Sequence, residues 1–146
     1  MKRTMTTIIA LLITVASSQV LARNDIQDYS IEEALFQEQA KEQVGNEIRF
    51  YFGKQKHGKV LKSWGEFATN KKTNAFLKSD QEACTWAFLS ALKALRDRAL
   101  REGGNAVIDI KSNYKGRTTV SDSTFQCGAG NIIAGVALKG TVVKLP

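Results

Sequence analysis

Five basic side chains stand close together in the sequence and could bind an anion. They are Lys54, Lys56, His57, Lys59 and Lys62. Lysines at this density, with Tyr51, Phe52 and Trp64 beside them, can hold a polyanion such as a nucleic acid, an acidic glycan or the phosphates of lipopolysaccharide. The same pattern also arises when aromatic rings face a core and lysines face water. Both interpretations follow from the residues.

The sequence offers little else for catalysis or cofactor binding. His57 is the only histidine and is interpreted as a solvated loop residue, and no serine or cysteine has another base to activate it. Gly128, Gly130 and Gly135 do not match the nucleotide-binding loops, which need a following lysine or a following helix. We therefore predict a protein that is not an enzyme and takes no cofactor and no nucleotide.

The N-terminus has the charged, apolar and small-residue order of a secretory signal peptide. Lys2 and Arg3 precede an apolar stretch at 8–15, which is shorter than the ~20 residues of a transmembrane anchor. We predict a signal peptide at 1–22, cleavage after Ala22, no transmembrane segment, and one periplasmic domain at 23–146. In that compartment lipopolysaccharide or an acidic glycan is the expected polyanion, and nucleic acid is not.

Cys84 and Cys127 are the only cysteines, and pairing is the default in an oxidising compartment. The alternatives are a metal pair and a reactive thiol. Two cysteines and one histidine fall short of a structural zinc set, and the C-x-x-C spacing of redox proteins is missing. We predict no metal site and one disulfide, which would stabilise the fold by roughly 3–4 kcal/mol on the chain-entropy model.

Charge is distributed unevenly along the chain. Residues 23–47 carry a net charge of −5, and residues 48–146 carry a net charge of +10. Either the acidic segment docks on the basic body, or the basic body faces an anionic partner.

The lysines must be positioned by strands and turns. Residues 47–52 and 60–69 each alternate apolar and polar side chains, which predicts two strands. Because the segment between them begins at Gly53 and reaches Gly58, we predict a hairpin with the lysines at its tip. A polar turn is expected at 70–74. Further strands are predicted at 106–114 and 132–145, joined by a polar connection at 115–123, and the last strand should be central because it is apolar on both sides.

Capping boxes predict two helices. The run Ser30-Ile31-Glu32-Glu33 opens a short helix that stops at Gly45. The run Ser79-Asp80-Gln81-Glu82 opens a long helix that ends at Gly103. One face of the long helix should sit on the sheet, and it is made of Cys84, Phe88, Ala91, Leu92, Leu95 and Ala99. A second apolar patch, covered by the N-terminal helix or by a partner, is made of Trp86, Leu89 and Leu100.

Together these elements predict an α+β fold. One long helix would pack on a mainly antiparallel sheet of about four strands, with a short N-terminal helix beside it. The disulfide would tie the long helix to the sheet.

Several stretches are similar to a family of small exported bacterial proteins. They are Phe50-Tyr51-Phe52-Gly53, Lys72 to Phe76, Ala83 to Leu92, Gly104 to Val107, Cys127 to Gly130 and Ala134 to Gly140. Many members carry the label "excinuclease ATPase subunit". This chain lacks the Walker motifs of such an ATPase, so the resemblance implies a small exported protein and not that activity.

The C-terminal half resembles the layout of the sensor lipoproteins of the Rcs envelope-stress phosphorelay. The shared layout is a cysteine-bearing helix, a strand beginning near Asn105-Ala106-Val107, and Cys127 leading into Ala137-Leu138. Those sensors have two disulfides and a lipid anchor, whereas one disulfide and no lipid anchor are expected here. The resemblance therefore implies a fold and a compartment, and no signalling role.

These observations predict a non-catalytic binding or interaction module of the bacterial envelope. Its partner would be an envelope protein, contacted by the basic hairpin or by the Trp86, Leu89 and Leu100 patch. The alternative is a polyanion-binding protein that uses the basic hairpin to hold an anionic envelope component.

Overall fold

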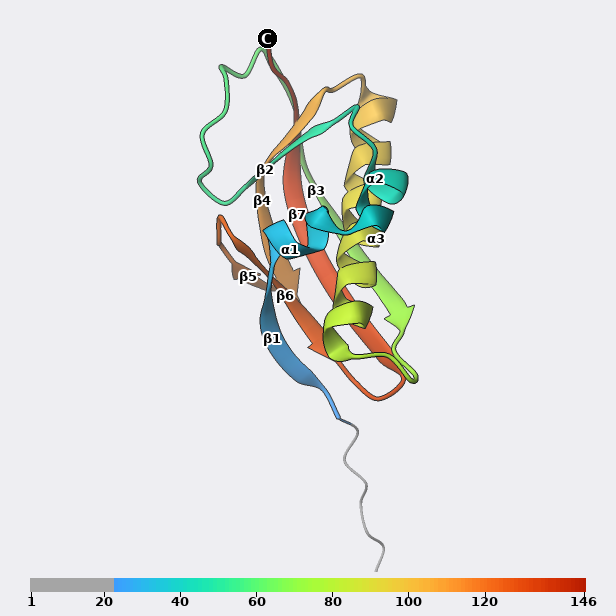
Figure 1. The fold of residues 1–146 in the computed structure, drawn as a ribbon. Coiled ribbons are helices and arrows are strands. Elements are labelled where there is room, and N and C mark those ends of the chain that lie inside the picture. Colours follow the sequence, from blue (N-terminus) through green and yellow to red (C-terminus); the bar gives the residue numbers. More distant parts are fainter. Residues whose placement is uncertain (1–22) are drawn as a thin grey trace, which may run out of the picture.

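The computed structural model describes residues 23–146, and the predicted signal peptide at 1–22 lies outside them. Figure 1 shows the long helix α3 (Asp80–Glu102) against a curved sheet, with the short helices α1 (Ile31–Phe36) and α2 (Glu38–Val44) beside it. The strands are β1 (Asp25–Ser30), β2 (Arg49–Phe52), β3 (Lys62–Asn74), β4 (Ala106–Tyr114), β5 (Arg117–Thr119), β6 (Thr124–Ala129) and β7 (Ile133–Lys144). Within residues 23–146, no helix is both long and apolar enough to cross a membrane.

The seven strands form one mixed sheet that curls into a half-barrel, with β7 at its centre. β3 pairs with β7 along its whole length on one side, while β4 and β6 share the other side. β1 extends the sheet beyond β6, β2 lies parallel to β4, and β5 folds back on β4. The predicted central position of the last strand is therefore confirmed.

The α+β class is confirmed, but the predicted sheet of about four strands under one long helix is wrong. The sequence pattern did not predict three of the strands, namely β1, β5 and β6. β1 is an exposed edge strand with no apolar alternation, and β5 has only three residues. Strand pairing uses backbone hydrogen bonds, which form without a periodic pattern of side chains.

The predicted hairpin between 47–52 and 60–69 is also wrong. β2 pairs with β4 and β3 pairs with β7, so two strands lie between the predicted partners. The pairing directions make β2 and β3 parallel, and residues 53–61 must therefore cross the sheet rather than turn back. The crossing ends where the Leu61 N–H donates to the Lys144 carbonyl at 2.8 Å. The turn predicted at 70–74 is likewise part of β3.

The long helix follows its sequence signals closely. The Ser79 hydroxyl accepts a hydrogen bond from the Glu82 N–H, and Gly103 ends the helix in the left-handed conformation at φ 83°. The face predicted to meet the sheet is buried. The N-terminal helix differs, because Gln37 adopts an extended conformation and divides it into α1 and α2.

A disulfide joins Cys84 of α3 to Cys127 of β6, as the sequence predicted. Both cysteines are fully buried. Beside them Phe88 stacks on Phe125 with ring centroids 4.0 Å apart, and Phe52 packs against Phe88 from β2. The disulfide and the aromatic cluster therefore hold the helix, β6 and β2 around one core.

The acidic N-terminal segment docks on the basic body through apolar contacts. Four of its side chains are buried in the core, namely Ile31, Ala34, Ala40 and Val44. Within residues 23–146, no ion pair joins an acid of 25–47 to a base of 48–146. The segment therefore docks as one of the two charge hypotheses predicted, but its acidic side chains do not hold it, and the ion pair that joins it to the body is that of Arg23 with Asp80.

Candidate functional site

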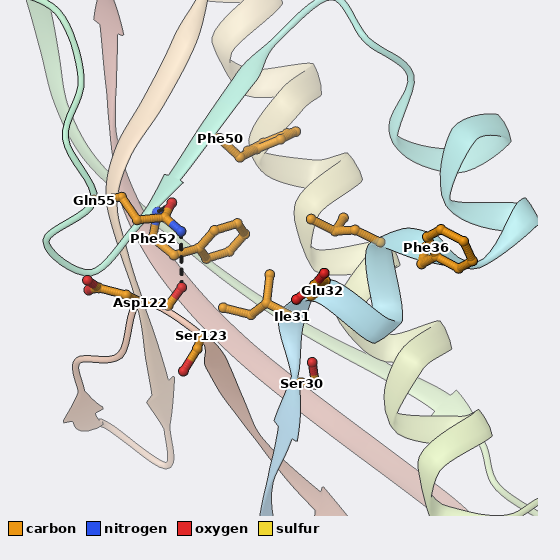
Figure 2. Close-up of a pocket in the computed structure, with 10 residues that line it drawn as sticks. Ser30, Ile31, Glu32, Phe36, Phe50, Phe52, Gln55, Asp122 and Ser123 are labelled. Carbon is orange, nitrogen blue, oxygen red and sulfur yellow. Dashed lines mark hydrogen bonds between the residues drawn. The ribbon is translucent and has the colours of Figure 1, made fainter.

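An open groove of about 620 Å³ lies between α1, β2 and the loop that precedes β6. Its apolar lining comes from Ile31, Leu35 and Phe36 of α1 and from Phe50 and Phe52 of β2. Figure 2 shows Ile31 on the helix side and the two phenylalanines on the strand side of a common space. The groove therefore forms where the N-terminal helix bridges the gap between the edge strands β1 and β2.

Hydrogen bonds around the rim hold the walls of the groove together. The Asp122 carboxylate accepts from the Lys54 N–H at 2.7 Å, and the Gln55 amide donates to the Asp122 carbonyl at 3.1 Å. On the opposite wall, the Ile31 N–H donates to the Ser123 carbonyl at 2.9 Å. These contacts make the groove a built feature of the fold, in which loops far apart in the sequence are tied to one another.

Two side chains at the groove are free to meet a ligand. Phe36 is 89% exposed at the end of α1, and Glu32 is exposed on the rim. A phenylalanine in this position contributes little to folding, because its surface stays in water. The groove can therefore accept an apolar side chain and place a carboxylate beside a cationic group.

Sequence reasoning missed this groove. Phe36 falls outside the apolar stripe of its predicted helix, and that mismatch was the signal that could have singled it out. Asp122 lies in the stretch 115–123, for which the sequence predicted only a polar connection. The groove is assembled from three separate segments, which sequence spacing does not bring together.

Residues 53–61 form a basic loop that starts at the groove and crosses the second face of the sheet. The Gly53 N–H donates to the Ile110 carbonyl at 2.8 Å. At the other end of the loop, Val60 packs with Tyr51 on a small cluster of Ile108, Val143 and Leu145. The loop is therefore a cover for the face of the sheet opposite α3, rather than the tip of a hairpin.

The five predicted basic residues all lie exposed along this loop and the start of β3. His57 packs edge-on against Tyr51 with ring centroids 5.7 Å apart, and its Nδ1–H donates to the Gly58 carbonyl. Lys62 lies over the Trp64 ring with Nζ 4.8 Å from the centroid. Lys54, Lys56 and Lys59 point into solvent. All five are thus exposed on one continuous segment, and His57 and Lys62 have partners within the chain.

The predicted apolar patch on α3 does not form one surface. Leu89 is fully buried, Trp86 is half-buried, and Leu100 is 46% exposed. α1 and α2 both pack against α3, and Figure 1 shows them beside it. Leu89 belongs to the core of the chain and is unavailable to a partner, so the three residues are not a joint contact site.

A charged cluster fastens α2 to α3 outside the groove. The Asp97 carboxylate accepts from Lys93 at 3.0 Å and from Arg96 at 2.9 Å, and these bonds hold the pKa of Asp97 below its ordinary value. Arg96 also donates to the Gln43 carbonyl at 3.3 Å. Asp97 therefore positions the arginine that clamps the end of α2.

No protein-family model, curated protein or solved structure matches the chain. In the part of the chain that is described, no three carboxylate, histidine or cysteine side chains gather as metal ligands. Its geometry defines a small disulfide-bonded α+β module with an open apolar groove and an adjoining basic loop.

Proposed function

We propose that this protein is a non-catalytic binding module of the bacterial envelope, and that the groove between α1 and β2 contacts an envelope protein. The observation that carries the proposal is an open groove with apolar walls, in which Leu35 and Phe50 are half-buried and Phe36 is 89% exposed. Clefts of roughly 300–1,000 Å³ with apolar walls and a few polar groups are typical ligand sites. The export of the chain rests on its N-terminal signal pattern.

The groove suits a short segment of a partner better than a broad surface. It lies between two sheet edges and is bounded by the loops at Gln55 and Ser123. An apolar side chain of the partner would displace water from Leu35 and Phe50, which are half-buried, and a neighbouring lysine or arginine would pair with Glu32. The expected recognition element is therefore an apolar residue next to a cationic one.

Site-specific crosslinking tests this proposal. A photo-crosslinking amino acid placed at Phe36 should capture a reproducible envelope protein in intact cells, identified by mass spectrometry. The matched control carries the same amino acid at Arg101, an exposed position near the far end of α3. Capture should also fall in a Glu32→Lys background, because the carboxylate would no longer pair with the partner.

The variants at Phe36 and Glu32 should fold normally, so two results would contradict the proposal. Both Phe36 and Glu32 are exposed, so their replacement leaves the core intact, and circular dichroism should confirm that the fold is unchanged. Equal capture from the Phe36 and Arg101 positions, or capture that is indifferent to Glu32→Lys, would show that the groove is not the contact site.

A second candidate function is polyanion binding by the basic loop. The observation that favours it is that Lys54, Lys56 and Lys59 are exposed on one loop and enter no ion pair within 23–146. Lipopolysaccharide phosphates or an acidic glycan would meet these three charges, and binding would weaken steeply with salt because bound counterions are released.

Titration with lipopolysaccharide at several salt concentrations tests this second candidate. Changing the three lysines to glutamine should lower the slope of log affinity against log salt by about one for each lysine. The control changes Lys41, Arg101 and Lys115 to glutamine, which removes the same charge elsewhere. If both triple variants bind equally, net charge explains the binding and the loop has no special part.

A further inference from the structure

The turn between β3 and α3 and the turn between β6 and β7 lie at the end of the molecule opposite the basic loop (Figure 1). Four large apolar side chains are exposed there. Phe76 and Leu77 lie between β3 and α3 and are 60% and 90% exposed, while Ile132 and Ile133, at the β6–β7 turn, are 66% and 54% exposed. The Ala75 N–H donates to the Ile132 carbonyl at 2.7 Å and so ties the turns together. We call these four side chains the apolar tip.

The turn that carries Leu77 is strained. The Lys78 N–H donates to the Ala75 carbonyl at 3.1 Å and closes a tight turn, in which Leu77 has a φ of 59°. This left-handed conformation favours glycine or asparagine, because a bulky side chain crowds the backbone there. Leu77 relieves none of this strain by packing, since it is exposed. Folding therefore does not account for a leucine at this position.

Lysines adjoin the apolar tip. Lys78 follows Leu77 directly, and Lys72 lines the same shallow hollow as Phe76, Ile132 and Ile133. Lys71, Lys72 and Lys78 are all exposed.

Three carboxylates lie near these lysines in the sequence or the fold. Asp25 and Asp80 both pair with Arg23, and Glu82 is exposed on the first turn of α3. Arg23 therefore neutralises the two aspartates in part. Glu82 and the three lysines Lys71, Lys72 and Lys78 enter no ion pair within residues 23–146, so the charge left beside the apolar tip is positive and suits an external anion.

We propose that the apolar tip docks this protein reversibly on the surface of an anionic phospholipid bilayer. The four apolar side chains would enter the boundary between headgroups and acyl chains, and the lysines would meet lipid phosphates. A second copy of the chain is a poorer occupant, because two tips in contact would bring their lysines together. The docked protein would point the basic loop and the C-terminus away from the bilayer and leave the groove open on its side.

Vesicle binding tests the proposal. The test protein is the chain 23–146 that the predicted cleavage after Ala22 would leave, which includes the buried core and the disulfide. It should float with vesicles of phosphatidylglycerol and phosphatidylethanolamine, bind vesicles of phosphatidylcholine more weakly, and dissociate as salt is added. Leu77→Asn and Ile132→Asn should each lower the affinity by about tenfold, because each removes one large apolar side chain from the bilayer.

Matched variants separate docking from general effects. Leu77→Asn relieves the strained turn, so lost binding cannot be attributed to unfolding. Phe36→Asn removes an equally exposed apolar side chain far from the apolar tip and should leave vesicle binding unchanged. A tryptophan placed at Phe76 should shift its fluorescence to shorter wavelength on vesicle addition, whereas one placed at Phe36 should not.

Several results would overturn this inference. Vesicle binding that survives Leu77→Asn and Ile132→Asn together, or that is lost equally in Phe36→Asn, would exclude the apolar tip as the docking element. Binding only to vesicles that contain lipopolysaccharide would exclude the phospholipid surface. A dimer in sedimentation experiments that Leu77→Asn dissociates would assign the tip to a second copy. The crosslinking from Phe36 tests the groove separately, so the two proposals fail independently.

Discussion

The two ends of this molecule both carry lysines, yet they differ in how far their apolar side chains are buried. The basic loop is tied to the sheet by the backbone of Gly53 and Leu61, and it places Val60 on a buried cluster, although the Leu61 side chain is 60% exposed. The apolar tip turns Leu77 and its neighbours into water on a strained turn. Apolar side chains stabilise a fold only when they leave water. The folding of the chain therefore explains the basic loop and leaves the apolar tip to be explained by binding.

The largest effect is expected from the disulfide, which lies in the core that supports both ends. Replacing Cys84 and Cys127 with alanine should lower the free energy of unfolding by about 3–4 kcal/mol, because the unfolded chain gains freedom. Equilibrium urea denaturation measures the change, and reduced wild-type protein should match the variant. Below the unfolding transition, binding at either end should persist. An unchanged midpoint would show that the bond contributes nothing to the core.

The next largest change in the free energy of unfolding is expected at the base of the basic loop. Gly53 has a φ of 55°, and an added Cβ would lie 2.8 Å from the Ser121 carbonyl carbon. Gly53→Ala should therefore lower stability by about 2 kcal/mol, through backbone strain and crowding together. Gly116 is a matched control, with a φ of 74° and open space around its Cα. Equal losses in the two alanine variants by urea denaturation would mean that the loop is not anchored tightly at Gly53.

A smaller effect of opposite sign is expected at the apolar tip. Leu77→Asn should raise the free energy of unfolding by about 1 kcal/mol, because asparagine tolerates the left-handed conformation that leucine resists. Lys115 has a φ of 51° in another turn, and Lys115→Asn should give a similar gain. Thermal denaturation of both variants measures these shifts. A loss of stability in Leu77→Asn alone would mean that Leu77 packs usefully, and the contrast between the two ends would fail.

The smallest change in the free energy of unfolding is expected at Asp97, which belongs to neither end. Its pKa is lowered first by the hydrogen bond from Lys93 and then by that from Arg96. The stabilisation is therefore present above the ordinary pKa of an aspartate and is lost as the pH falls through the lowered value. Asp97→Asn should cost less than ~1 kcal/mol at neutral pH, and the difference from wild type should vanish in acid. Denaturation across pH measures it, and a difference that grows in acid would contradict the assignment.

Part of the candidate site was predictable from sequence, and part was not. The five basic residues between Lys54 and Lys62 are exposed on one continuous segment of the chain, and their binding of an anion stays a prediction. The second apolar face around Leu89 was given two possible covers, the N-terminal helix or a partner, and the chain itself buries Leu89. Helical periodicity identifies such a face without showing which of the two covers it. Phe36 and Leu77 were not predicted as contact residues, because the role of a single apolar residue in a polar stretch is ambiguous until its exposure is known.

The sequence by itself determined the features that depend on local chemistry. The limits of α3 follow from the Ser79 cap and the Gly103 stop, its buried face follows from helical spacing, and two cysteines allow only one internal bond. The tertiary structure alone decided which strands are neighbours, and with them the parallel β2–β4 pair, the crossing basic loop, the groove and the apolar tip. The physical reason is that a side-chain pattern indicates which face of an element avoids water, but not which strand lies beside it. Neighbouring strands are joined by backbone hydrogen bonds, which every residue type except proline can both donate and accept.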